Sequence, residues 1–183
     1  MNRPFLWCWT DTPIIRMPFL PSLALCMLLV GCSPDLDWRE VHPDGGGFSV
    51  WLPARPNAQS RPLNEGGGPP VVMWQWSARA RETAFAAGYV DYPERPEAET
   101  LLSALVRNIN GRVTDRRNVR AGDIPGIEIR AAGTASGSEL ELRLRVFPMG
   151  SRLYEAAVLG RPGDLTEADV ETFFGSFKIE VRR

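Results

Sequence analysis

Residues 139–147 alternate apolar and charged side chains more strictly than any other stretch, and this pattern limits the possible folds most. The apolar members are Leu140, Leu142, Leu144 and Val146, and the charged members are Glu139, Glu141, Arg143 and Arg145. Successive side chains of a β-strand point to opposite faces, so we expect the apolar set to face a core and the charged set to face solvent. Such alternation is typical of an antiparallel strand, and cross-strand ion pairing accounts for the interleaved charges.

Other stretches with strand character lie before and after this one. The predicted strands cover residues 48–52, 71–77, 83–92, 113–119, 127–131, 152–160 and 178–181. The stretch 113–119 is polar and rich in arginine, which places it near an edge of the sheet. Residues 54–70 contain several prolines and a triple glycine, so we expect a loop there.

Two amphipathic helices complete the predicted elements. Residues 97–110 carry apolar side chains at one-sided helical spacing and end at Asn110-Gly111. Residues 167–177 follow Thr166, which together with Asp169 forms a capping-box pattern. These elements predict an α+β fold in a single domain: a twisted antiparallel sheet of about six or seven strands packed with two helices.

An apolar run from Met17 to Val30 ends in Leu29-Val30-Gly31-Cys32, and polar residues follow at once. This tetrapeptide resembles the lipobox of bacterial lipoprotein precursors. The run is shorter than the roughly 20 residues of a membrane-spanning helix, which favours a cleaved signal segment. The resemblance implies that residues 1–31 are a signal peptide and that Cys32 becomes the lipidated N-terminus. An uncleaved anchor helix with an incidental cysteine, and a translation start at Met17, are the alternatives.

The domain organisation and location follow from this cleavage site. Residues 32–46 are expected to form a tether and residues 47–183 the folded domain. Ser33 follows the cysteine where an aspartate would favour retention, so the expected location is the cell envelope, on the outer membrane facing the periplasm. The expected partners are the membrane, through the lipid on Cys32, and another envelope protein.

The remaining composition argues for a binding role over chemistry. The net charge of −1 shows no basic excess for nucleic acid, and His42 is the only histidine. Clustered cysteine and histidine for a zinc site are absent from the sequence, and the residues around Ser136 do not match a nucleophile elbow. We therefore expect no catalytic residue, no metal and no cofactor; an enzyme with an unrecognised site is the minor alternative.

Five short motifs resemble a bacterial envelope domain with a PsbP-like (DcrB-like) fold. They are Gly47–Pro56, Ala86–Pro93, Ile124–Glu128, Ser151–Tyr154 and Phe173–Phe177. The resemblance implies a twisted antiparallel sheet that carries both helices, and it implies little about activity. The expected function is a non-enzymatic accessory or binding module, with a structural subunit of an envelope assembly as the alternative.

Three tryptophans are candidates for a partner surface: Trp51, Trp74 and Trp76. Trp74 and Trp76 share one strand face and can fill the space above the small residues of the stretch 84–88, either as core packing or as a ligand groove. Trp51 must point away from the face that its strand neighbours bury. We expect it to be open if the two helices share one face of the sheet and covered if they take opposite faces, and we favour the covered arrangement.

Overall fold

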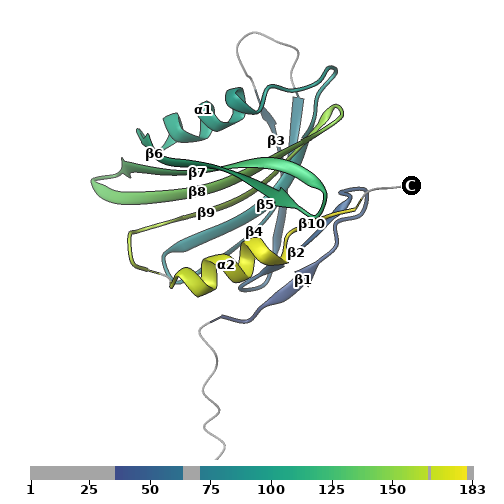
Figure 1. Cartoon of the computed structure of the whole chain (residues 1–183). Helices are drawn as coiled ribbons and strands as arrows, with labels where there is room; N and C mark the ends of the chain where they lie inside the picture. Colours follow the sequence, from purple (N-terminus) through teal and green to yellow (C-terminus); the bar gives the residue numbers. More distant parts are fainter. Residues whose placement is uncertain (1–35, 64–70, 165, 181–183) are drawn as a thin grey trace, which may run out of the picture. The chain divides into compact units, whose positions relative to one another are not determined.

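The computed structural model describes residues 36–63, 71–164 and 166–180, all within the compact unit Asp35–Arg183 (Figure 1). The described residues form the following elements: β1 (Arg39–Val41), β2 (Phe48–Leu52), β3 (Asn57–Leu63), β4 (Val71–Ala80), β5 (Thr83–Asp91), α1 (Ala98–Asn108), β6 (Arg112–Ala121), β7 (Ile124–Ala135), β8 (Ser138–Met149), β9 (Arg152–Gly160), α2 (Glu167–Ser176) and β10 (Lys178–Ile179). The α+β class and both predicted helices are confirmed.

Seven of these strands form one antiparallel sheet, called here the main sheet, in the order β3-β4-β5-β9-β8-β7-β6. The expected number of strands is confirmed, and the arginine-rich β6 lies at an edge as expected. The expectation of a loop over residues 54–70 is wrong for Asn57–Leu63, which is the other edge strand. Its side chains are mostly exposed, so no apolar alternation marks it, and Pro62 is tolerated because an edge strand has one side without ladder partners.

The two helices cover opposite faces of the main sheet (Figure 1). The apolar side of α1, with Leu101, Leu102 and Val106, packs against one face, to which β8 contributes Leu142 and Leu144. The aromatic side of α2 packs against the other face, where Phe173 contacts Phe85 with ring centroids 5.2 Å apart. In the described residues, no helix is long and apolar enough to cross a membrane.

The face under α2 is shared with a second, three-stranded sheet of order β1-β2-β10, called here the small sheet. Phe48 of β2 joins the two sheets, because its ring lies 5.8 Å from Trp76, 6.2 Å from Tyr154 and 5.4 Å from Phe177. The strand β1 falls inside the expected tether of residues 32–46, and Trp38 lies edge-on to Phe85 at 6.2 Å. The fold therefore starts about ten residues earlier than expected, since this segment pairs with β2.

Trp51 is 44% exposed, so the expectation that helices on opposite faces would cover it is wrong. The reason is that β2 belongs to the small sheet. Its inner side chains, Phe48, Val50 and Leu52, are at most 1% exposed against the main sheet. Trp51 points from the outer face of the small sheet, which neither helix covers.

We expect Phe48→Ala to lower the free energy of unfolding by about 3–5 kcal/mol, because it removes the ring that joins the two sheets. Trp51→Ala, three residues further on but on the outer face, is the matched control and should cost about 1 kcal/mol or less. Urea unfolding followed by circular dichroism measures both values. Equal losses in the two variants would contradict the assignment of the two faces.

Candidate functional site

The three candidate tryptophans do not form one surface. Trp76 is half-buried, stacks on Tyr89 at 6.4 Å and lies opposite Ala87, which confirms that it fills the space above small residues. Trp74 is 45% exposed and, with the equally exposed Val72, forms an apolar patch on β4. Trp51 faces outward from the small sheet, whose inner residue Phe48 packs on Trp76.

Cys32, the expected lipidation site, lies outside the described residues, so its lipidation stays a prediction. The described chain begins at Leu36, which is partly buried and packs against the core beneath the small sheet. His42 is well exposed and lies 3.3 Å from Glu40.

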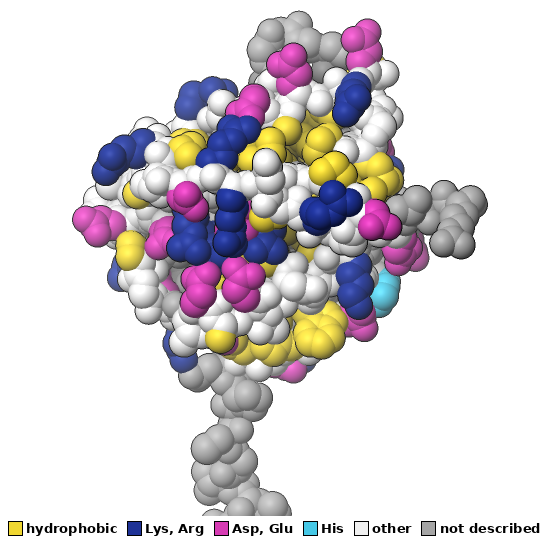
Figure 2. All heavy atoms as spheres, viewed as in Figure 1, with side chains coloured by type: hydrophobic (Ala, Val, Ile, Leu, Met, Phe, Trp, Pro, Cys, Tyr) yellow, Lys and Arg dark blue, Asp and Glu magenta, His cyan; other side chains and the backbone are white. Residues whose placement is uncertain are grey.

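A layer of seven charged side chains attaches α2 to the main sheet. It consists of Arg117, Glu128, Arg130, Arg143, Arg145, Glu167 and Glu171, and is called here the charged layer. In Figure 2, dark-blue and magenta side chains gather along the line where α2 meets the sheet. The ion pairs therefore join a helix to strands that are far from it in the sequence.

Glu128 and Arg143 are the centre of the charged layer and are only 1% and 4% exposed. Glu128 binds Arg143 at 3.3 Å, Arg117 at 2.8 Å and Arg145 at 2.5 Å. On the helix side, Arg143 reaches Glu167 at 2.8 Å and Glu171 at 2.7 Å. The expectation that Arg143 and Arg145 face solvent is therefore wrong, because α2 lies over them.

Aromatic contacts extend the charged layer into the core. The guanidinium of Arg145 lies 4.2 Å from the ring centroid of Phe174, and that of Arg143 lies 5.4 Å from it. A cation over an aromatic face is stabilised by the ring quadrupole, and more strongly where water is excluded. Phe174 thus lets α2 bury apolar area directly beside the arginines.

The protonation state of Glu128 follows from two opposing effects. Burial alone would raise the pKa of this carboxyl group, but hydrogen bonds from Arg117 and Arg145 outweigh it and hold the pKa below its usual value. Glu128 is therefore charged at neutral pH. Its contribution to stability is present above the unfolded pKa and is lost as the pH falls through the lower, folded pKa.

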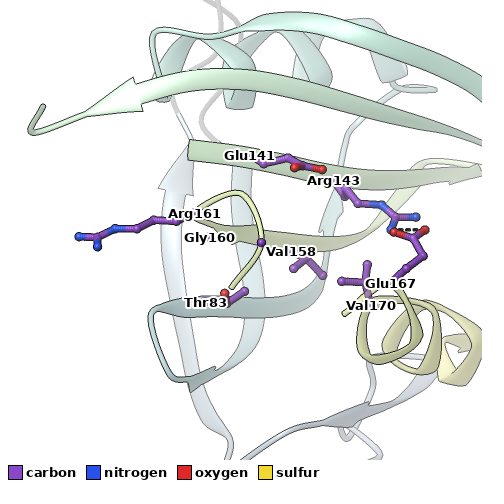
Figure 3. A pocket seen from close by; sticks show the side chains of 9 residues that line it. Thr83, Glu141, Arg143, Val158, Gly160, Arg161, Glu167 and Val170 are labelled. Carbon is purple, nitrogen blue, oxygen red and sulfur yellow. Dashed lines mark hydrogen bonds and ion pairs between the residues drawn. The ribbon is translucent and has the colours of Figure 1, made fainter. Parts of the chain in front are cut away.

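A cavity of about 110 Å³ opens beside the first turn of α2 (Figure 3). Its lining includes Thr83, Glu141, Arg143, Gly160 and Glu167; Arg161 also contributes, with a side chain that points away. Among the described residues, Thr83 Oγ1 and Arg143 Nε have no hydrogen-bond partner. The space and the free polar atoms suit water or a small polar group.

This cavity offers no activated nucleophile within the described part of the chain. A threonine hydroxyl attacks a substrate only when a neighbouring base takes its proton, and Thr83 Oγ1 has no such hydrogen bond. The wall also carries both charge signs, with Glu141 and Glu167 beside Arg143. We interpret the cavity as a polar gap at the end of the charged layer.

A second buried carboxyl group, Glu155, lies on the opposite face of the main sheet and is 1% exposed. Gln75 donates a hydrogen bond of 2.9 Å to its Oε1 across Gly88, which lies between the two residues in the sheet. A Cβ on Gly88 would come 2.2 Å from the carbonyl oxygen of Trp74, so a glycine is required there. The second oxygen of Glu155 has no partner among the described residues.

Burial raises the pKa of Glu155 to about 7, although the Gln75 hydrogen bond and the charge of Arg61 act in the other direction. A carboxyl group with a raised pKa can serve as a general acid, but this one is sealed from solvent. Its titration therefore changes the stability of the fold.

Sequence reasoning found the three tryptophans but missed the charged layer and Glu155. One signal for the layer was present: Glu167, Glu171 and Phe174 follow helical spacing and so lie on one side of α2. Glu155 gave a weaker signal, a single acidic residue inside the apolar stretch 153–158.

Comparison with known proteins identifies the fold. The solution structure of cyanobacterial PsbP (CyanoP) from Synechocystis sp. PCC 6803 is similar with a TM-score of 0.53 at 10% identity, over 81% of this chain and 95% of that one. At this identity the likeness shows the fold alone, and it confirms the expected PsbP-like architecture. A scan against protein-family models and a search of curated proteins found no match.

Two crystal structures are more distant. A protein from Bacteroides thetaiotaomicron has a TM-score of 0.41 and 13% identity over 74% of this chain; the match spans 46% of that chain, less than half its length. The protein PA94 from Pseudomonas aeruginosa also has a TM-score of 0.41 and 13% identity, over 73% of this chain and 89% of that one.

We expect Glu128→Gln to destabilise the fold by about 3–5 kcal/mol at neutral pH, because it removes the buried carboxylate that Arg117, Arg143 and Arg145 share. Glu167→Gln removes a carboxylate that is 62% exposed and should cost about 1 kcal/mol or less. Chemical denaturation at pH 7 measures both. Similar small losses would mean that the layer contributes as an ordinary surface network.

For Glu155 we expect the opposite dependence on pH. Its folded pKa of about 7 lies above the pKa of 4.5 that a glutamate has in the unfolded chain, so its contribution is fully present below pH 4.5 and is lost as the pH rises through 7. The loss amounts to about 3 kcal/mol at 1.4 kcal/mol per pKa unit. Unfolding curves between pH 4 and 8 should show this decrease in the wild type and not in Glu155→Gln. The exposed Glu180→Gln is the control, and parallel curves for wild type and Glu155→Gln would contradict the prediction.

Proposed function

We propose that this protein is a lipid-anchored component of the bacterial cell envelope that acts as a non-enzymatic accessory or binding module. The observation that carries the proposal is the sequence Leu29-Val30-Gly31-Cys32 placed four residues before the first described residue, Leu36. Cleavage before Cys32 would leave a lipid directly in front of the folded unit. Ser33 supports the outer membrane, facing the periplasm, as its location.

The use of the charged side chains supports binding over catalysis. Glu128 and Arg143, the ion-paired centre of the charged layer, are not exposed to a substrate, and Arg143 holds α2 to the main sheet through Glu171. The described residues hold no group of three His, Cys, Asp or Glu that could bind a metal ion.

A structural subunit of an envelope assembly is the second candidate, and the patch of Val72 and Trp74 favours it. The two side chains are 45% exposed and lie on one face of β4, opposite Pro62 and Ser60 of the edge strand β3. An apolar patch beside an open strand edge suits a protein partner. This role is compatible with the lipid anchor.

We expect the wild-type chain, produced in a bacterial host, to be cleaved before Cys32, to carry fatty acyl chains and to enter the detergent phase on Triton X-114 partitioning. Cys32→Ala should stay uncleaved or remain in the aqueous phase, because no thiol is left to acylate. Mass spectrometry of the N-terminus and density-gradient fractionation of membranes measure processing and location.

Cys26→Ala is the matched control, since it removes another cysteine of the same apolar run and should change nothing. Identical partitioning of wild type and Cys32→Ala, with no acyl mass on the wild type, would refute the anchor.

A further inference from the structure

We propose that the outer face of the small sheet lies on the lipid bilayer and that Trp51 enters the boundary between its headgroups and acyl chains. The inference rests on the proposed function, because it takes Cys32 as the lipidated residue. It goes further by assigning a surface of the domain and a partner of defined chemistry, a phospholipid surface.

The chain between the proposed anchor and the fold is short. Only Ser33, Pro34 and Asp35 separate Cys32 from Leu36. Consecutive Cα atoms are at most 3.8 Å apart, so a lipid on Cys32 holds Leu36 within about 15 Å of the membrane surface. A domain held this closely must present one particular side to the lipid.

The small sheet lies on that side. The chain enters the fold along the small sheet, where the backbone N–H of Asp37 donates to the carbonyl oxygen of Pro53 at 2.8 Å. Three residues later, Glu40 pairs with Trp51. The four residues from Leu36 to Glu40 cover about 13 Å of extended chain, so Trp51 lies about that far from the point of entry into the fold. In Figure 1, β1 and β2 lie together on the side of the fold where the described chain begins.

The chemistry of this face also suits a lipid surface. Trp51 is 44% exposed, and an indole is stabilised at a membrane interface because its ring is apolar while its N–H remains hydrated. The charges nearby are mixed: Glu40 is Trp51's cross-strand neighbour, and Lys178 pairs with Ser49 on the same side of β2. Contact therefore depends on the indole and is expected to be insensitive to salt.

Trp74 provides a matched control because its exposure is nearly the same and its position is different. On β4, Trp74 lies four residues from Ala78. Ala78 pairs with Phe85, whose ring contacts Trp38 near the entry of the chain. Trp74 thus lies about 13 Å of strand from the level of Trp38, whereas Glu40, the partner of Trp51, is only two residues, or about 7 Å of extended chain, from Trp38. It is also on the main sheet, whereas Trp51 is on the outer face of the small sheet.

The test uses the full chain, processed in a bacterial host and reconstituted into vesicles of phosphatidylcholine and phosphatidylglycerol with partly brominated acyl chains. Bromine quenches an indole that touches the acyl region, and residues 32–183 contain Trp38, Trp51, Trp74 and Trp76. We expect quenching in the wild type, loss of that quenching in Trp51→Phe, and its retention in Trp74→Phe at low and high salt.

Two results overturn the inference while leaving the anchor intact: a vesicle-bound, acylated wild type without quenching, or equal quenching in wild type and Trp51→Phe. A wild type that carries no acyl chain and does not bind vesicles refutes the proposed function and the inference with it. In cells, a photo-crosslinking amino acid in place of Trp51 should yield lipid adducts. Protein adducts without lipid adducts would assign this face to a protein partner and overturn the inference.

Discussion

The arrangement of this protein depends on one buried arginine, Arg143, that joins α2 to the main sheet. Removing charges from water costs several kcal/mol per ion, so a buried arginine is tolerated only when carboxylates satisfy it. Arg143 has three such partners, Glu128 from β7 and Glu167 and Glu171 from α2. The spacing of the two carboxylates matches that of the two arginines. Glu167 and Glu171 are four residues apart on a helix, a rise of about 6 Å, and Arg143 and Arg145 are two residues apart on a strand, about 6.8 Å. Any shift of α2 along β8 would therefore leave buried charge without a partner.

The two faces of the main sheet shift the pKa of a buried glutamate in opposite directions. Glu128 has three arginine neighbours, so its pKa is lowered and it is ionised at neutral pH. Glu155 has one amide donor, Gln75, so burial dominates and its pKa rises to about 7. The α2 face is thus held by fixed charges, whereas the α1 face contains a carboxyl group whose charge changes near neutral pH. Near neutrality, a change of pH acts on the α1 face.

The sequence predicted the features that depend on the spacing of side chains within one element. It could not predict the features that depend on partners far away in the chain. The alternation around Leu142 and Leu144 identified β8 and its buried side, and Thr166 with Asp169 identified the start of α2. The same alternation was wrong for the charged side, because the segment that covers Arg143 comes more than twenty residues later. The strand β3 was missed for a related reason: its side chains are largely exposed, so it carries no apolar pattern. The position of Trp51 depended on a second sheet, whose strands β1 and β10 are only three and two residues long.

Short strands also explain how the fold separates its two exposed tryptophans. The small sheet covers the core with Phe48, Val50 and Leu52, and this leaves Trp51 on its outer side. Trp74 remains open because it lies on β4 outside the area that the small sheet covers. An indole on each of two separate surfaces would allow the proposed contacts with lipid and with a protein partner at the same time. If Cys32 carries the proposed lipid, the three residues between it and Leu36 favour the surface nearest to them, that of Trp51, for the lipid and leave Trp74 for the proposed protein partner.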